Sequence, residues 1–200
     1  MKKIYAVPVL ATLGLFTIFG MAQNSRASQL QFCQGQVVTI PGNAFNNVLV
    51  GTPGDDVIHG FEGNDTIDGN GGNDVICGGE GNDTIDGGAG NDELQGGPGN
   101  DEVRGKNGND DVRGGDGEDE VFGGAGNDTV LGGDGDDVVT GGTGDDELYG
   151  GGGNDYLDAD DDESDSVIQG GPNGVTGDTC EIDLLHELWT PTGCETIILQ

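Results

Sequence analysis

The chain has 200 residues, of which 43 are Gly and only six are Phe, so it offers little material for an ordinary hydrophobic core. It carries 38 Asp and Glu residues against six Lys and Arg, which gives a formal net charge of −32. Such a charge argues against nucleic acid and anionic membrane surfaces as partners and favours a cationic partner.

Residues 1–27 differ from the rest of the chain and have the pattern of a secretory signal peptide. Lys2 and Lys3 precede an apolar run over residues 4–19, and we expect cleavage after Ala27, or alternatively after Ala22. We expect removal rather than retention as a membrane anchor, hence no membrane insertion and a mature net charge of −35. The predicted location is secreted and extracellular, with the periplasm or the cell surface as alternatives.

The next segment, residues 28–50, is expected to form an N-terminal cap. Its last nine residues, GNAFNNVLV (42–50), are a weak copy of the repeat that follows. Gly42 stands at the first position, Asn47 replaces Asp at the sixth, and Leu49 stands at the eighth. A solenoid has open ends and its terminal repeats are atypical, so we interpret this copy as a degenerate capping half-unit.

Residues 51–158 consist of twelve nine-residue units without insertions. Gly occupies the first and the fourth position of every unit, and Asp occupies the sixth. The eighth position is always Ile, Leu or Val. The second is Gly in eight units and otherwise Thr52, Phe61, Asn70 or Lys106. A disordered low-complexity tract has no reason to keep a large aliphatic residue in one register, so the period indicates a repeat fold.

The unit GGxGxDxUx, in which U is a large aliphatic residue, resembles the calcium-binding nonapeptide repeat of the RTX, or haemolysin-type, family. The resemblance covers 108 residues. It implies an all-β fold, a right-handed parallel β-roll (a solenoid) with short N- and C-terminal caps. It also implies six-residue turns that carry calcium, three-residue strands and two units per coil. With one ion between each pair of successive turns on an edge, about ten Ca²⁺ ions are expected, five along each edge.

The residue types suit this ion. Calcium takes six to eight oxygen ligands, which peptide carbonyls and Asp carboxylates supply, whereas zinc and copper prefer the Cys and His that the repeats almost lack. Glycines at positions one, two and four are expected to take positive φ and turn their carbonyls toward a common point. The candidate metal ligands are the Asp residues at position six: Asp56, Asp65, Asp74, Asp83, Asp92, Asp101, Asp110, Asp119, Asp128, Asp137, Asp146 and Asp155.

Residues 159–200 are expected to form a degenerate coil and a C-terminal cap. The register breaks after the last unit and partly recovers at Asp165 and at Asp178. The acidic run at 160–163 is interpreted as a solvated loop. Apolar residues between positions 181 and 189 have roughly helical spacing, and residues 196–199 are typical of a short strand. We expect this tail to pack over the last coil.

Four cysteines in an exported chain form an even set and are expected to pair, in one of three possible ways. Cys180 and Cys194 flank the tail, where a disulfide would staple the cap. Cys77 occupies position nine, whose side chain points out of the sheet, and Cys33 lies before the first coil. We therefore favour the pairs Cys33–Cys77 and Cys180–Cys194.

The segments outside the repeats are too short for a catalytic domain and contain no HExxH motif or nucleophile elbow, so no enzyme activity is expected. The repeats hold 28 acidic and three basic residues, and coiling concentrates this charge, so calcium binding and folding are expected to be one event. The first functional hypothesis is a secreted calcium-binding repeat protein that acts as a structural or surface-associated module. The alternative is a calcium-dependent adhesin that recognises cell-surface or matrix components.

Overall fold

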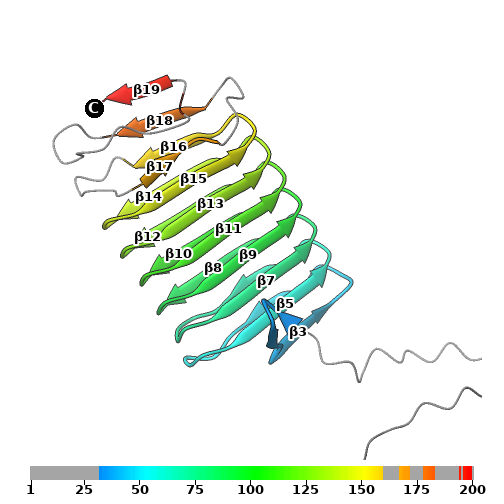
Figure 1. Cartoon of the computed structure of the whole chain (residues 1–200). Coiled ribbons are helices and arrows are strands. Elements are labelled where there is room, and N and C mark those ends of the chain that lie inside the picture. Colours follow the sequence, from blue (N-terminus) through cyan, green and yellow to red (C-terminus); the bar gives the residue numbers. More distant parts are fainter. Residues whose placement is uncertain (1–31, 160–166, 172–177, 183–193, 195, 200) are drawn as a thin grey trace, which may run out of the picture.

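The computed structural model describes residues 32–159, 167–171, 178–182, 194 and 196–199, which form an all-β structure (Figure 1). The predictions for residues 1–27, 160–163 and 183–189 lie outside these residues. In the described part of the chain, no helix is long and apolar enough to cross a membrane.

Two parallel sheets face each other, and a short antiparallel hairpin lies beside them. One sheet has nine strands: β4 (Val48–Val50), β6 (Thr66–Asp68), β8 (Thr84–Ala89), β10 (Glu102–Asn107), β12 (Glu120–Ala125), β14 (Val138–Thr143), β16 (Tyr156–Ala159), β18 (Thr179–Ile182) and β19 (Thr196–Leu199). The other has eight: β3 (Ile40–Asn43), β5 (Val57–Glu62), β7 (Val75–Glu80), β9 (Glu93–Pro98), β11 (Asp111–Asp116), β13 (Thr129–Asp134), β15 (Glu147–Gly152) and β17 (Val167–Gln169). The hairpin consists of β1 (Phe32–Cys33) and β2 (Gln36–Val37).

Each strand of the repeats pairs in parallel with the strand two units away. Val103 of β10, for example, lies opposite Val121 of β12, and Val112 of β11 lies opposite Val130 of β13. Consecutive units therefore alternate between the two sheets, and two units complete one coil of the roll seen in Figure 1. The predicted parallel β-roll is confirmed.

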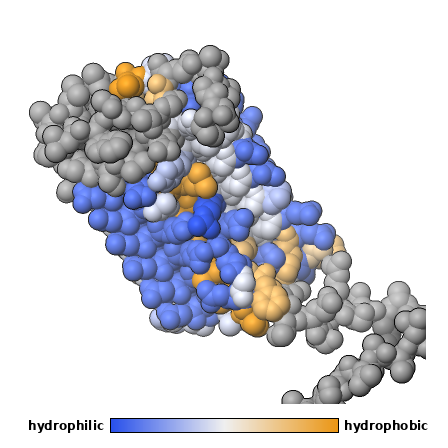
Figure 2. All heavy atoms as spheres, viewed as in Figure 1, coloured by the Kyte–Doolittle hydropathy of each residue, from blue (hydrophilic) through white to orange (hydrophobic). Residues whose placement is uncertain are grey.

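The core of the repeats consists of aliphatic side chains, one from each unit. They come from position eight, point between the two sheets, and are at most 1% exposed: Ile58, Ile67, Ile76, Ile85, Leu94, Val103, Val112, Val121, Val130, Val139, Leu148 and Leu157. The period-two alternation of a strand places their neighbours outside. The outer surface is accordingly hydrophilic over most of the face visible in Figure 2.

The strands are longer than the three residues that the resemblance implies. Strands β8 to β15 each have six residues and run from position seven through position three of the next unit. The extension arises because residues after the core position also pair with the neighbouring coil, as Lys106 does with Gly124 and Asn107 with Ala125. Only positions four to six remain as the turn between strands.

The sheets extend beyond the twelve units at both ends. Ile40 of β3 pairs with Ile58, and Leu49 of β4 pairs with Ile67, so residues 40–50 contribute a strand to each sheet. At the other end, Cys180 of β18 lies opposite Leu157, and β19 pairs with β18. The strand expected at residues 196–199 is confirmed. Ile182, by contrast, continues strand β18 and is not helical, because the sheet edge at β16 offers it a pairing partner.

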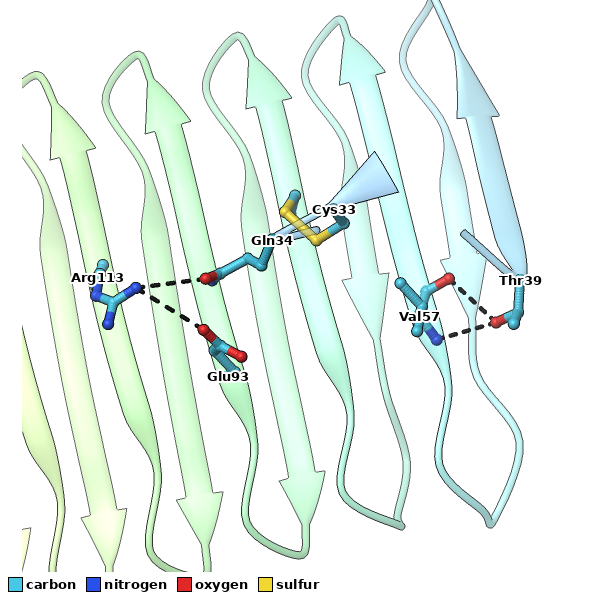
Figure 3. The surroundings of a disulfide bond; sticks show 7 residues. Cys33, Gln34, Thr39, Val57, Glu93 and Arg113 are labelled. Carbon is cyan, nitrogen blue, oxygen red and sulfur yellow. Dashed lines mark hydrogen bonds and ion pairs between the residues drawn. A yellow bond between two sulfur atoms is a disulfide. The ribbon is translucent and has the colours of Figure 1, made fainter. Parts of the chain in front are cut away.

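Both favoured disulfides are confirmed, Cys33–Cys77 and Cys180–Cys194. The first fastens the β1–β2 hairpin to β7 on the outer face of the eight-stranded sheet (Figure 3), where Cys33 and Cys77 are buried together with Val75. The hairpin reaches further along the sheet through Gln34, whose Oε1 accepts a hydrogen bond from Arg113 at 3.4 Å.

Candidate metal centre

The twelve position-six Asp side chains are buried at the two edges of the roll, with exposed fractions of 0 to 8%. Each stands immediately before a strand, so the fixed period places the Asp residues of alternate units one above the other. Twelve carboxyl groups thus form two columns, one along each edge. A buried carboxylate is costly unless its oxygens are bound, so the partners of these oxygens determine what the columns can do.

From Asp65 onward, one carboxylate oxygen of each column member has a backbone partner one coil earlier. Oδ1 accepts a hydrogen bond from the backbone N–H of the Asp one coil earlier, as Asp119 does from Asp101 at 2.7 Å and Asp128 from Asp110 at 2.8 Å. Because donor and acceptor are 18 residues apart, these bonds join successive coils. The same contact reaches the N-terminal copy, where the N–H of Asn47 donates to Asp65 at 2.7 Å.

The other oxygen, Oδ2, is buried without a hydrogen-bond partner along most of both columns. Such oxygens belong to Asp65, Asp74, Asp83, Asp92, Asp101, Asp110, Asp119, Asp128, Asp137 and Asp155. Buried side-chain oxygens normally have a partner, and a regular series of exceptions indicates that something other than a protein donor binds there.

The position-one glycines border these oxygens, with a geometry that differs from the expectation. Their φ angles are not positive. Instead, a Cβ at Gly123 would lie 2.6 Å from Asp128 Oδ2 and 2.6 Å from the carbonyl oxygen of Gly141 in the next coil. Glycine is required because a carboxylate oxygen and a backbone carbonyl oxygen approach the same small space, which a side chain would fill.

Positive φ is found at positions two and four, as expected for these. Every unit from Gly60 onward has it at both, for example at Gly115 (136°) and Gly117 (139°). Phe61, Asn70 and Lys106 keep positive φ at position two although they are not glycine. Position four opens the three-residue turn and position two lies near the end of the strand before it, so this repeated conformation sets the path of the chain into each turn.

Burial raises the pKa of ten of the column carboxyls above the ordinary 3.8. The pKa rises to about 7 for Asp101, Asp128 and Asp137, and to about 6 for Asp83 and Asp92. The hydrogen bond from the backbone one coil earlier lowers the pKa, whereas repulsion from charged neighbours in the column raises it further. The columns thus concentrate negative charge in a poorly solvated place, which a cation would relieve.

The donor set is one of oxygens. Among the described residues, no group of three or more His, Cys, Asp or Glu side chains gathers at one point. The available donors are therefore one unpaired Asp oxygen in most turns together with nearby backbone carbonyls. Hard oxygen donors of this kind suit calcium, which accepts carbonyl and carboxylate ligands in flexible geometry. Fold and donors together define a calcium-binding parallel β-roll.

Comparison with known families agrees with this class. The family model of the RTX calcium-binding nonapeptide repeat (4 copies) matches residues 41–76, 78–112, 95–130, 104–139 and 131–164, together more than half of the chain. The chain therefore belongs to the family of RTX calcium-binding nonapeptide repeat proteins, whose repeats bind Ca²⁺. No curated protein matches the chain.

One column member lies outside the twelve units. Asp178 is 3% exposed, and its Oδ1 accepts a hydrogen bond from the N–H of Asp155 at 3.1 Å, as in the repeats. The sequence indicated only a partial recovery of the register there. The missed signal is Asp178 followed two residues later by Cys180, since Cys180 is buried in the core at the place of the usual aliphatic residue.

Proposed function

We propose that this protein is a secreted, non-catalytic module whose β-roll folds when Ca²⁺ binds along the two Asp columns. The ligands would be the position-six Asp carboxylates, each with backbone carbonyls of its own turn and of the turn one coil away, for about ten ions. The observation that carries the proposal is the series of buried Oδ2 atoms without a protein partner. When bound, calcium would supply positive charge that balances these carboxylates.

Coupling of folding to calcium follows from what the chain lacks. Its core has one aliphatic side chain per nine residues, and the rest of each unit is mainly Gly and polar residues. Without the ion, closing the columns would bury repelling carboxylates, whose raised pKa reflects that cost. An affinity of roughly 0.1 to 1 mM, usual for extracellular calcium modules, would leave the chain unfolded in a calcium-poor cytosol and fold it after export.

Circular dichroism of the mature protein tests this coupling. Titration from excess chelator to about 10 mM Ca²⁺ should convert a coil spectrum into a β spectrum, with a midpoint in the range given for extracellular modules. The same titration with Mg²⁺ should fail, because Mg²⁺ demands a tighter octahedral site. A chelated sample with the same spectrum and melting temperature as the loaded one would contradict the proposal.

A calcium-dependent adhesin is the second candidate. The outer face of the eight-stranded sheet has a groove lined by Arg113, Leu131 and the glycine strip at Gly133 and Gly151, and this face would present its outward residues to cell-surface or matrix components. Binding of the calcium-loaded protein to its own isolated cell envelope, reversed by chelator and weakened in Arg113→Ala, would favour the adhesin. Absence of binding would leave the structural module.

A further inference from the structure

The first turn on each edge differs in backbone conformation from all later turns. The units that start at Gly42 and Gly51 have positive φ at neither position two nor position four, whereas every unit from Gly60 onward has it at both. In the second of these units the two positions are Thr52 and Gly54. The change of conformation therefore falls at one boundary, between the first coil and the rest of the roll.

In the unit that starts at Gly51, the second oxygen of the Asp carboxylate is hydrogen-bonded within its own turn. Oδ2 of Asp56 accepts hydrogen bonds from the backbone N–H of Thr52 at 2.6 Å and from its hydroxyl at 2.9 Å. The N–H of Gly54 donates to the same hydroxyl at 3.2 Å. A Cβ built on Gly51 would lie 3.2 Å from Asp56 Oδ2, against 2.6 Å for the matching pair Gly123 and Asp128. The Asp56 oxygen therefore lies further from the position-one glycine than in the later units.

A unit of nearly the same sequence differs from this one at position two and in its place along the roll. Residues 51–54 read GTPG and residues 96–99 read GGPG, yet Gly97 and Gly99 have positive φ and Asp101 Oδ2 has no partner. Pro at position three is thus compatible with the open turn. So is a non-glycine residue at position two, as Lys106 shows. Thr is β-branched and strongly disfavours positive φ, which leaves its N–H pointing at the carboxylate.

The other edge begins with a neutral side chain that accepts the same hydrogen bond from position two. Oδ1 of Asn47, at position six, accepts a hydrogen bond from the N–H of Asn43, at position two, at 2.7 Å. An amide oxygen thus occupies the place that a carboxylate has elsewhere. This closed geometry requires no negative charge, and hence no cation to balance one.

We propose that hydrogen bonds replace calcium in the first turn on each edge, and that Thr52 holds Asp56 in this arrangement through its N–H and its hydroxyl. The inference rests on the proposed calcium function and refines it. The column that contains Asp56 then begins to bind ions at Asp74 and holds one ion fewer than the five expected for its edge. The first coil, whose Val57 packs against the Cys33–Cys77 cluster, becomes a calcium-independent base on which later coils stack.

Equilibrium dialysis with radioactive Ca²⁺ on the mature chain tests the proposal by counting bound ions at saturation. Thr52→Gly, which recreates GGPG, should add about one ion, while Thr52→Val, which stays β-branched, should add none. Asp56→Asn should leave the number unchanged, whereas its column neighbour Asp74→Asn should lose at least one ion. Circular dichroism at saturating calcium verifies that each variant is folded.

The two proposals fail in different ways. If Asp56→Asn loses as many ions as Asp74→Asn, or if Thr52→Gly gains none, the closed first turn is wrong while the calcium columns stand. If the wild-type chain binds no calcium, the columns themselves are wrong, and this inference falls with them.

Discussion

The carboxylate of Asp119 accepts a hydrogen bond from the backbone N–H of Asp101 with one oxygen, at 2.7 Å, and keeps its other oxygen buried without a protein partner. The first contact joins two coils, and the second leaves a coordination site at the same place. Each carboxyl group thus combines a structural and a ligand role. A substitution that separates the two roles is the most direct test of the columns.

Asp119→Asn makes this separation, because the amide oxygen can still accept the bond from Asp101 while the negative charge is lost. We expect the calcium-loaded roll to lose roughly 1–3 kcal/mol, the cost of a buried polar group without its partner. The calcium midpoint of folding should rise several-fold. Asp116→Asn is the matched control, since Asp116 lies at the exposed position three of the same unit. Equal midpoints for both variants would argue against a ligand role for Asp119.

The small space beside each position-one glycine predicts a second effect. In Gly123→Ala the new methyl group would meet Asp128 Oδ2 and the Gly141 carbonyl at 2.6 Å each. We expect a loss of roughly 1–3 kcal/mol in thermal unfolding with calcium, as for an overpacked core. Gly54→Ala is the control, because its nearest neighbour, Thr52 Oγ1, is 4.0 Å away and its φ is not positive. Comparable losses at both positions would show that space around the carboxylate is not the cause.

Much of this fold could be predicted because one period determines it. An invariant aliphatic residue at position eight requires a common interior, and Asp at position six recurs at the same edge whenever alternate units stack. Local conformation was harder to predict. A position-one glycine could be required for its backbone conformation or for its small size, and only the next coil decides between the two. The Gly141 carbonyl that faces Gly123 shows that small size is the reason. Thr52 likewise appeared to be one of four tolerated variants, and only its backbone conformation and hydrogen bonds in the structure distinguish it from Lys106.

Removal of the Cys33–Cys77 bond should loosen the N-terminal end. The double variant Cys33→Ser, Cys77→Ser opens a loop with a sequence separation of 44, for which we expect a loss of roughly 2–4 kcal/mol in the calcium-loaded form. Detachment of the hairpin would also expose Val75, which is now 7% exposed. Thermal unfolding and limited proteolysis within residues 32–40 measure the two effects. An unchanged melting temperature with unchanged proteolysis would show that the hairpin contributes nothing to the first coils.

The raised pKa values predict how acidity affects the calcium-free chain. A carboxyl group whose pKa is 3.8 in the unfolded chain and about 7 in the roll, as for Asp101, binds its proton more tightly when folded. Its contribution therefore favours folding below pH 3.8 and is lost as the pH rises through 7. Asp128 and Asp137 act in the same direction.

In excess chelator, we therefore expect β-structure to increase as the pH falls from about 7.5 to about 4.5, because protons then replace calcium in neutralising the columns. With saturating calcium the β signal should instead be greatest at neutral pH, since protons compete with the ion for the same carboxylates. Circular dichroism over this range, with light scattering to detect aggregation, measures both curves. If calcium-free and calcium-loaded samples responded to pH in the same direction, protons and calcium would not be competing for the Asp columns.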